Sequence, residues 1–519
     1  MEASTKGATT PAAMFGAMET SPAVPQLSDA LDKPIAHAFP LRHAAELFSL
    51  MVLDLIGLAF SFFLALLLRV HILPALSSIF PRGISLRLMA TLWWLPITFV
   101  LFFAYEGLYS RRQPFWREFY SLVKAVTLAF VVALAVVSLG KLQEQVSRTV
   151  ILLTWINSLV TLPIARYTGK NWLARIGVWQ RPVIVLGAGK TGELVARALT
   201  REPYLGYYIY GFLDDDPAKR ARGIQVNGIR YPVLGGFRDS DAVMEATGVR
   251  HLIVAAPGMP SRALVGLVNR LQRRADTVLV VPDLFGLPVA GVEADYFFDE
   301  QALAFKVRNN LANPLNAFLK RVFDLAAGII VLILALPIMA LIALAIVLDS
   351  PGPVIFAHRR IGRTGKEFKC YKFRTMVINA QEVLKDILSR DPRLREEWER
   401  DFKLKNDPRV TRVGRILRRT SLDELPQIFN VLRGEMSLVG PRPRPLYERE
   451  RKDKTGLFEI GLGTKPGMTG LWQVSGRSEL DFMHRLMLDA WYARNWSLWI
   501  DITLILRTIP VLLRRCGAY

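Results

Sequence analysis

Cysteine is scarce in this chain. Its 519 residues include only two cysteines, Cys370 and Cys516, which excludes a disulfide framework and a zinc site built from several cysteines. Acidic residues are also in short supply, because 45 Asp and Glu stand against 66 Lys and Arg and leave a net charge of +21. An excess of this size favours partners that carry phosphates, such as nucleic acids, nucleotides or lipid head groups.

Long apolar runs are abundant, and 51% of the residues are hydrophobic, more than a soluble or disordered protein usually contains. Residues 1–43 are rich in Pro, Ala and Ser and show no signal-peptide pattern, so we predict a disordered tail. Four stretches of bilayer-spanning length follow, at about 46–68, 88–105, 122–140 and 149–165. Arginines and lysines between the second and third stretches and after the fourth favour a bundle with both ends in the cytoplasm. Asp54 lies inside the first stretch, either as a functional acid or as a packing partner of another helix.

A soluble α/β unit is expected at about 180–300, where apolar strands alternate with helical patterns. The strand that starts at Arg181 leads into a glycine-rich turn with Gly187, Gly189 and Gly192, and acids follow at 214–216. This G-x-G-x-x-G spacing is typical of a dinucleotide-binding turn. A Rossmann-like scaffold that keeps the turn without a bound dinucleotide is the alternative.

A fifth apolar run spans Val322 to Leu348 and contains Pro337 near its middle, where proline kinks a helix. Lys320 and Arg321 precede the run, and a very basic region begins at Arg359. Because both basic flanks favour the cytoplasmic side, we predict a re-entrant helix over 320–349 rather than a fifth span. The aromatic residues at 491–499 fit either an interfacial helix or a soluble core helix.

The stretch 406–443 carries the residues with the clearest chemical potential. Taken alone, Ser421-Leu-Asp423-Glu424 is a capping box at a helix start. Arginines at 415, 418, 419 and 442 surround it, however, so two ionised carboxylates would lie where a phosphate is held. Since adjacent helix positions face different directions, one carboxylate could attack while the other holds a metal ion.

From about Leu319 to Tyr519 the sequence resembles the bacterial polyprenyl-phosphate hexose-1-phosphate transferases, the monotopic phosphoglycosyl transferases. Five motifs carry the resemblance: Lys320-Arg-Val-Phe-Asp324, Phe368-Lys-Cys-Tyr-Lys372-Phe-Arg-Thr-Met, Arg419-Thr-Ser-Leu-Asp-Glu-Leu-Pro-Gln, Met436-Ser-Leu-Val-Gly-Pro-Arg-Pro and Lys465-Pro-Gly-Met-Thr-Gly-Leu-Trp-Gln-Val-Ser-Gly-Arg477. The bundle and the α/β unit resemble the long members of that family, and the C-terminal stretch is similar to its undecaprenyl-phosphate galactose phosphotransferases. One departure is Leu336, which stands where small members often have a serine before the proline.

The resemblance implies transfer of hexose 1-phosphate from a UDP-hexose to undecaprenyl phosphate with release of UMP, as the first membrane step of O-antigen, capsule or exopolysaccharide synthesis. Galactose is the first choice of sugar and glucose the second. In the family pattern Asp423 attacks the β-phosphate to form a covalent intermediate, and Glu424, together with Asp423, holds Mg²⁺. The matching basic residues are expected phosphate contacts, or alternatively interfacial residues that meet anionic lipid: Arg360, Lys372, Arg418 and Arg442.

We therefore predict a membrane α-helical bundle, a Rossmann-like α/β domain and a mainly α catalytic domain with a re-entrant membrane helix. The expected boundaries are 1–43 for the tail, 44–170 for the bundle, 171–305 for the α/β domain and 306–519 for the catalytic domain. The expected location is the bacterial inner membrane, with both soluble domains on the cytoplasmic side. A homodimer is compatible with this organisation.

Two other functions fit parts of the sequence. A membrane-bound nucleotide-sugar dehydratase or epimerase would also join a bundle to a Rossmann unit, but its Tyr-x-x-x-Lys spacing occurs only at Tyr120 and Lys124, upstream of the glycine turn. A nucleic-acid binder or scaffold would explain the charge of +21. The bases cluster beside apolar segments, however, so we expect a lipid bilayer rather than nucleic acid as the partner.

Overall fold

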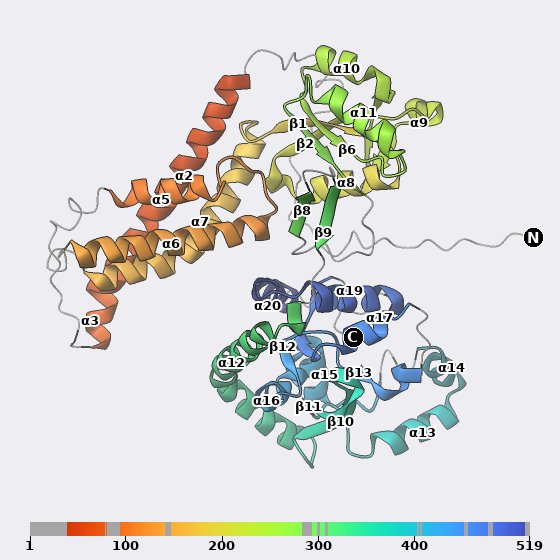
Figure 1. The fold of residues 1–519 in the computed structure, drawn as a ribbon. Helices are drawn as coiled ribbons and strands as arrows, with labels where there is room; N and C mark the ends of the chain where they lie inside the picture. The colour runs from red at the N-terminus through yellow and green to blue at the C-terminus, as the bar shows by residue number, and fades with distance from the viewer. Residues whose placement is uncertain are drawn as a thin grey trace, which may run out of the picture. The chain divides into compact units, whose positions relative to one another are not determined.

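The computed structural model describes residues 39–77, 79, 94–140, 147–282, 293–297, 302–306, 310–401, 404, 407–450, 455–475 and 481–513. The described part of the chain divides into two compact units, the first within residues 17–283 and the second within residues 284–519. Figure 1 shows the elements of each unit. Of the predicted tail 1–43, residues 1–38 lie outside the described part of the chain, and the remaining five residues belong to the first helix.

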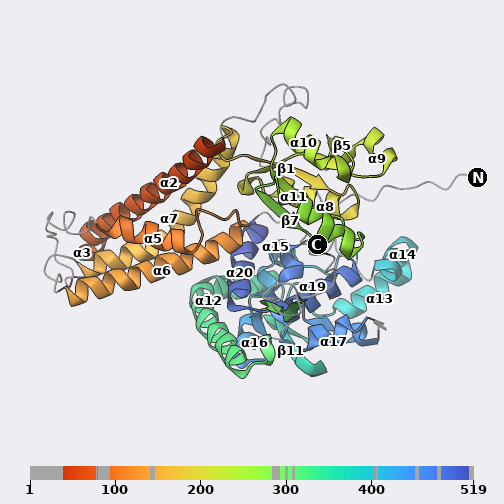
Figure 2. The ribbon, with the colours of Figure 1, turned by 45° about the horizontal axis from the view of Figure 1, so that its top comes forward.

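The first unit begins with long apolar helices that pack side by side, as both views show (Figures 1 and 2). Their bounds are α2 (Phe39–Leu67), which continues through η2 (Leu68–Ile72) into α3 (Leu73–Leu76), then α5 (Leu95–Tyr105), α6 (Phe115–Leu139) and α7 (Arg148–Arg175). The core between them is apolar, with Leu50, Phe103 and Leu162 almost fully buried. Three of the four predicted spans therefore coincide with helices long and apolar enough to cross a membrane.

The second predicted span, 88–105, is only partly reproduced. Helix α5 starts at Leu95, with Pro96 in its first turn, and its 11 residues reach about 17 Å at 1.5 Å per residue. That length is short of the roughly 30 Å of hydrocarbon in a bilayer. Residues 88–93 lie outside the described part of the chain. Among the described residues, the fourth helix of spanning length is in the second unit.

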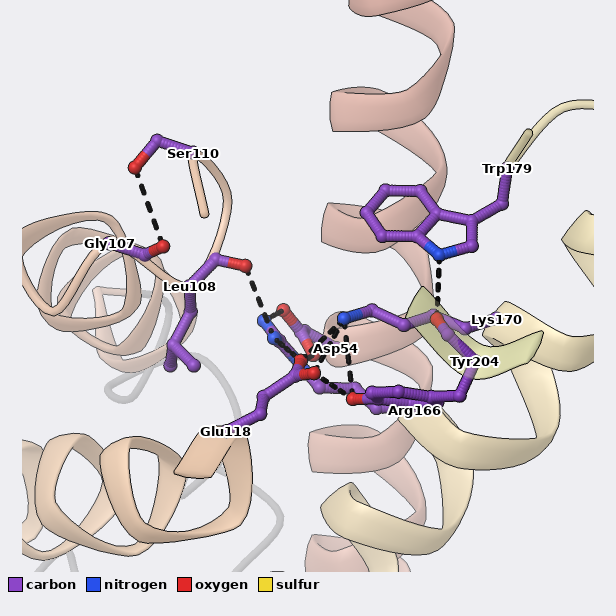
Figure 3. A network of polar contacts seen from close by, with 9 residues as sticks. All are labelled: Asp54, Gly107, Leu108, Ser110, Glu118, Arg166, Lys170, Trp179 and Tyr204. Carbon is purple, nitrogen blue, oxygen red and sulfur yellow. Dashed lines mark hydrogen bonds and ion pairs between the residues drawn. The ribbon is translucent and has the colours of Figure 1, made fainter. Parts of the chain in front are cut away.

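Five polar side chains form a buried network at one end of the bundle (Figure 3). Arg166 of α7 donates to both oxygens of Asp54 of α2, at 2.7 and 2.6 Å, and to Glu118 of α6 at 2.6 Å. Lys170 donates to Glu118 at 2.7 Å, and the Tyr204 hydroxyl also donates to this carboxylate. Asp54 is therefore an ion-pair partner of a neighbouring helix, the second of its two predicted roles. Because Tyr204 belongs to the α/β part, the network ties that part to the bundle.

The α/β part is a doubly wound parallel sheet, as predicted. Its strands and helices alternate: β1 (Arg181–Leu186), α8 (Lys190–Arg201), β2 (Tyr207–Leu213), α9 (Pro217–Arg222), β5 (Val233–Gly235), α10 (Ser240–Thr247), β6 (His251–Val254), α11 (Ser261–Leu271) and β7 (Thr277–Val280), with the hairpin β3 (Ile224–Val226) and β4 (Ile229–Tyr231) after α9. The strand order β5-β2-β1-β6-β7 is that of five consecutive strands of a Rossmann sheet, and every pairing within it is parallel.

The second unit is mainly helical and contains short sheets. It holds the hairpin β8 (Glu293–Phe297) and β9 (Ala302–Lys306), α12 (Pro314–Asp349), the hairpin β10 (Ile355–Ile361) and β11 (Glu367–Phe373) with β13 (Arg444–Pro445) beside it, α13 (Ala380–Arg390), α14 (Pro392–Asp401), α15 (Arg412–Thr420), α16 (Gln427–Arg433), β12 (Ser437–Val439) paired with β14 (Gly467–Thr469), α17 (Leu457–Leu462), α18 (Leu471–Val474), α19 (Phe482–Asn495) and α20 (Leu498–Leu513). Tyr492 and Trp496 are buried in its core, which supports the core alternative for these two residues, whereas Trp491 and Trp499 are only half-buried.

Helix α12 stays helical through Pro337 and is bent in both views (Figures 1 and 2). Its first turns are fastened to the unit by buried polar contacts. Lys320 pairs with Asp501 of α20 at 2.7 Å, and Asp324 accepts hydrogen bonds from Ser437 and Leu438. At its other end, the Asp349 carboxylate accepts a hydrogen bond from the Val413 N–H of α15 at 3.0 Å. Both ends of this apolar helix therefore bind one folded body.

Candidate active site

The two predicted carboxylates lie on a 3₁₀ turn, η8 (Leu422–Glu424), between α15 and α16. Ser421 closes α15 in the left-handed region, with φ of 58°, and its side chain makes no capping hydrogen bond. Helix α16 begins only at Gln427. The capping-box alternative is therefore wrong, because the segment that would be capped turns as a separate 3₁₀ element. Asp423 and Glu424 therefore do not take part in a cap at a helix start.

Lys372 faces both carboxylates. Its Nζ lies 2.6 Å from Glu424 Oε1 and 3.6 Å from Asp423 Oδ2, so Glu424 receives the hydrogen bond and Asp423 lies beyond normal hydrogen-bond distance. The prediction that the adjacent carboxylates face different ways assumed a regular α-helix. On the tighter 3₁₀ turn both reach one ammonium group.

Asn430 sets the position of Lys372 relative to this turn. Its side chain in α16 accepts a hydrogen bond from the Tyr371 N–H at 3.0 Å and donates to the Lys369 carbonyl at 2.7 Å. These two bonds attach strand β11 to the helix that follows the carboxylates. Asn430 is fully buried within an apolar helix. No sequence motif pointed to this residue, although a lone amide in the apolar run 428–432 is a visible signal.

Burial and charge act against each other on these groups. Burial raises the pKa of the Asp423 carboxyl above its ordinary value, although the nearby Lys372 and Arg418 charges oppose the increase. Burial lowers the pKa of the Lys372 ammonium, but Glu424 and Asp423 more than offset this effect, so its pKa is raised. The site therefore holds a desolvated carboxylate, Asp423, whose side chain is 13% exposed, beside a cation that remains charged.

The other three predicted basic residues lie in two places: Arg418 lies beside the carboxylate turn, and Arg360 and Arg442 lie near each other. Arg418 of α15 lies near the Asp423 charge, and its Nε donates to the Thr375 hydroxyl at 2.9 Å. Arg360 shares one face of the β10–β11 hairpin with Lys372, because their cross-strand partners are Phe368 and Phe356 in the antiparallel register. Arg360 and Arg442 lie close enough that their like charges act on each other. Arg442 covers the Trp472 ring at 5.0 Å.

A buried ion pair supports the loop that carries Arg442. Arg444 donates to Asp489 of α19 at 2.6 Å, and both side chains are almost inaccessible. Burial raises the pKa of Asp489 to about 6, while Arg444 and the Arg442 backbone N–H oppose the increase. The sequence analysis did not single out either partner, since they lie 45 positions apart and only the tertiary structure brings them together.

The two carboxylates also suit a hard divalent cation. Among the described residues no three His, Cys, Asp or Glu side chains converge on one point. Mg²⁺, however, is usually held by one or two carboxylates together with substrate phosphates. Asp423 and Glu424 already share the Lys372 ammonium, so their negative charge converges on one cation. The residues present therefore fit Mg²⁺ bound jointly with a substrate.

The glycine turn of the α/β part is hydrogen-bonded to the acid that follows β2. Asp214 Oδ2 accepts a hydrogen bond from the Ala188 N–H in the turn at 2.7 Å and lies 3.1 Å from Lys219. Asp214 directly follows β2, where the dinucleotide pattern places an acid that binds a ribose hydroxyl. A Cβ on Gly187 would lie 2.4 Å from the Ala255 carbonyl oxygen, and one on Gly192 would lie 2.0 Å from Gly187 O, whereas one on Gly189 would meet nothing within 4 Å. Close packing explains Gly187 and Gly192 under both the dinucleotide-binding and the scaffold interpretation, so both interpretations stay open.

Comparison with known proteins agrees with this division of the chain. Residues 315–515 match the family model described as bacterial sugar transferase, and residues 104–282 match a CoA-binding domain model. Undecaprenyl-phosphate galactose phosphotransferase of Salmonella typhimurium is 41% identical over 415 residues, 79% of this chain and 84% of the relative. UDP-galactose-lipid carrier transferase of Erwinia amylovora is 40% identical over 79% of this chain and 84% of the relative.

A third relative is named for a different sugar. UDP-glucose:undecaprenyl-phosphate glucose-1-phosphate transferase of Escherichia coli is 31% identical over 66% of this chain and 69% of its own length. All three alignments cover more than the carboxylate-bearing unit alone, since that unit is less than half of the chain. The architecture, the carboxylate turn and these similarities together show that the chain belongs to the bacterial sugar transferase family.

Proposed function

We propose that this chain transfers a hexose 1-phosphate from a UDP-hexose to undecaprenyl phosphate and releases UMP, as the first membrane step of O-antigen, capsule or exopolysaccharide synthesis. The observation that carries the proposal is the pair Asp423 and Glu424 on one 3₁₀ turn that faces Lys372. An anionic lipid phosphate must approach an anionic pyrophosphate, so the reaction requires alignment and positive charge above all. Galactose is the favoured sugar, because the two more similar relatives are named for it.

Asp423 is the proposed nucleophile. Its carboxylate oxygen attacks the β-phosphorus of the UDP-sugar, the bond from that phosphorus to the bridging oxygen breaks, and UMP leaves with the bridging oxygen. A phosphate oxygen of undecaprenyl phosphate then attacks the same phosphorus and releases Asp423. Asp423 suits this role better than Glu424, because Glu424 receives the short Lys372 hydrogen bond. Lys372 and Arg418 stabilise the phosphate charges at the turn, and Arg360 and Arg442 are the proposed contacts further along the same face.

Mg²⁺ is the proposed cofactor, held by Glu424 and Asp423 together with substrate phosphates. When bound, it would neutralise charge on the pyrophosphate during phosphoryl transfer. The dehydratase alternative gains no support from the fold. Tyr120 and Lys124 lie on the apolar helix α6, and Lys124 pairs with Glu106 at 2.8 Å.

The re-entrant form of α12 is also a proposal, as is the cytoplasmic side of the bacterial inner membrane for both soluble parts. The first half of the helix packs on α16 and β12, and its last turns pack on α15. Helices α15 and α16 are joined by the short carboxylate turn, so one small body holds both ends of α12. A straight crossing of the bilayer would separate those ends by its full thickness. The outward face of α12 is exposed and apolar, with Leu334 and Leu341 at 70% and 68%, as a lipid-facing surface requires.

The transfer reaction is directly measurable. In the presence of undecaprenyl phosphate, the purified full chain is expected to release UMP from UDP-galactose, and more slowly from UDP-glucose. Release that occurs equally well without the lipid acceptor, or oxidation of the sugar by a bound nicotinamide, would contradict the proposal and favour a nucleotide-sugar-modifying enzyme.

Asp423→Asn is expected to reduce UMP release by roughly 10³-fold or more, because an amide cannot form the phosphoryl bond. The wild-type chain is expected to retain radiolabel from sugar-labelled UDP-galactose, and the variant to retain none. The matched control is Asp386→Asn, which removes a carboxylate from an exposed ion pair with Arg390. An Asp423→Asn enzyme with near-normal turnover would end the role assigned to this residue.

The pH profile tests the charge balance at the turn. A carboxylate nucleophile must be deprotonated, so kcat/KM falls as the pH falls through the pKa of Asp423, which burial raises. Lys372→Met removes a positive charge that opposes this increase, and its acidic limb is therefore expected at higher pH than in the wild type. Lys369→Met, an exposed neighbour on the same strand, is expected to leave the limb in place. A limb that moves to lower pH in Lys372→Met would contradict the assignment.

Removal of divalent cations with EDTA is expected to abolish UMP release, and added Mg²⁺ is expected to restore it. In Glu424→Gln, the Mg²⁺ concentration needed for half-maximal activity is expected to increase, because one of two carboxylate ligands is lost. Glu382→Gln, at an exposed position of α13, serves as the control. Full activity in EDTA would rule out the metal.

Cysteine labelling tests the topology of α12. Leu315→Cys and Ile355→Cys lie near its two ends, and both native side chains are exposed. With Cys516 replaced by alanine, the remaining native cysteine is Cys370, which is buried and has a thiol pKa raised to about 11 by that burial. Both engineered sites are expected to react with an impermeant maleimide from the cytoplasmic side only. Reaction of the two sites from opposite sides would show that α12 spans the membrane.

A further inference from the structure

A basic cavity lies in the second unit (residues 284–519), apart from the carboxylate turn (Leu422–Glu424). Its volume is about 90 Å³, which is enough for several water molecules and hence for a tetrahedral oxyanion. Four positive side chains line it: Lys320 and Arg321 of α12, Arg363 after β10, and Lys465 before β14. Lys320 is paired with Asp501 and Asp324, which leaves the other three. The sequence analysis singled out the motifs that contain Arg321 and Lys465, but the proposed reaction assigns them no role.

The positive groups lie close together. A Cβ placed on Gly434 would be 3.3 Å from Arg321 Nη2 and 3.6 Å from Lys465 Nζ, so both nitrogens contact the same small volume. Burial lowers the pKa of Lys465 and the like charges of Arg321, Arg363 and Lys320 lower it further, while the Asp324 carboxylate, which also lines the cavity, opposes the decrease. Repulsion of this kind is relieved when an anion binds between the charges.

The two nearby carboxylates form their ion pairs with Lys320 rather than with these three groups. Asp324 accepts from Ser437 and Leu438, and its ion-pair partner is Lys320. Asp501 is occupied by Lys320, Tyr492 and Trp496.

Within the described part of the chain, no carboxylate lies at ion-pair distance from Arg321, Arg363 or Lys465. Arg321 donates to the carbonyls of Val431 and Leu432, which holds its guanidinium in place and leaves further N–H donors available.

The cavity is separated from the carboxylate turn by the length of α16. Arg321 binds the carbonyls near the C-terminal end of this helix, whereas Asp423 and Glu424 precede its N-terminal end. Seven helical residues correspond to about 10 Å. The cavity also borders the first turns of α12, where Leu315 and Phe318 are 62% and 63% exposed. Exposed apolar residues beside cations are typical of the membrane interface, where lipid phosphates lie.

We propose that Arg321, Arg363 and Lys465 form a second phosphate-binding site, distinct from the carboxylate site, which takes the phosphate group of an anionic membrane lipid or of a soluble phosphate compound. The guanidinium of Arg321 is held in place by backbone carbonyls and supplies directed donors, while Lys465 and Arg363 add charge. This site does not depend on the proposed transfer reaction, so it can be tested whether or not the chain releases UMP.

The test uses the full chain in nanodiscs of phosphatidylcholine, with increasing phosphatidylglycerol in one series and increasing inorganic phosphate in the other. The variant is Arg363→Gln with Lys465→Met, because neither side chain makes a hydrogen bond among the described contacts on which folding would depend. The control is Lys385→Met with Arg393→Gln, which removes the same charge from exposed positions of α13 and α14. Retained lipid is counted by native mass spectrometry, and the unfolding temperature is measured in both series.

The wild type and the control are expected to retain one tightly bound phosphatidylglycerol and to unfold at higher temperature as this lipid increases, because a ligand that binds the folded state stabilises it. The Arg363→Gln/Lys465→Met variant is expected to lose the retained lipid and to need at least tenfold more phosphatidylglycerol for the same shift. If inorganic phosphate alone reproduces the difference, the site takes a soluble phosphate. If the variant and the control behave alike in both series, the proposal is overturned.

Discussion

Lys320 brings a positive charge into the core of the second unit (residues 284–519). The assembly of that unit depends on neutralisation of this charge. Its ammonium pairs with Asp501 at 2.7 Å and donates to the Val439 carbonyl at 3.1 Å. Asp501 in turn accepts from the Tyr492 hydroxyl and the Trp496 indole, both in the core. A buried charge without its partner typically costs roughly 3–5 kcal/mol, so α12, β12, α19 and α20 are held to one arrangement.

That arrangement fixes the first turns of the apolar helix α12 to the unit that carries the proposed active site. Helix α16 packs on α12, and its Asn430 fastens strand β11, which brings Lys372 to the carboxylate turn. Membrane attachment and the reactive geometry are therefore built from the same contacts. An enzyme that joins a water-soluble donor to a lipid acceptor needs this coupling, because the two substrates arrive from different phases.

In the first unit, buried ion pairs also hold separate elements together. Arg166 and Lys170 balance Asp54 and Glu118 at the end of the bundle, and Tyr204 extends the network into the Rossmann-like sheet. Displacement of the sheet from the bundle would remove the Tyr204 hydroxyl from this network and would break the ion pair at 2.8 Å between Arg181 of β1 and Glu46 of α2. The Rossmann-like part is thus attached to the bundle by polar contacts. Its glycine turn packs closely against Ala255 and donates a hydrogen bond to Asp214.

The sequence alone determined the classes of structure and the candidate site. Apolar length predicted the long apolar helices, alternation of strands and helices predicted the parallel sheet, and the motif around Asp423 and Glu424 predicted the candidate active site. Each of these depends on local periodicity or on a contiguous motif, which a sequence displays directly.

The tertiary structure decided the features that local sequence patterns could not predict. It showed that Ser421 caps no helix, that α5 is too short to span a bilayer, and that both carboxylates face Lys372. It also brought together Arg321, Arg363 and Lys465, which no motif joins. The contacts of Lys372 and the three-cation cluster depend on residues far apart in the chain, and packing alone sets which of them meet.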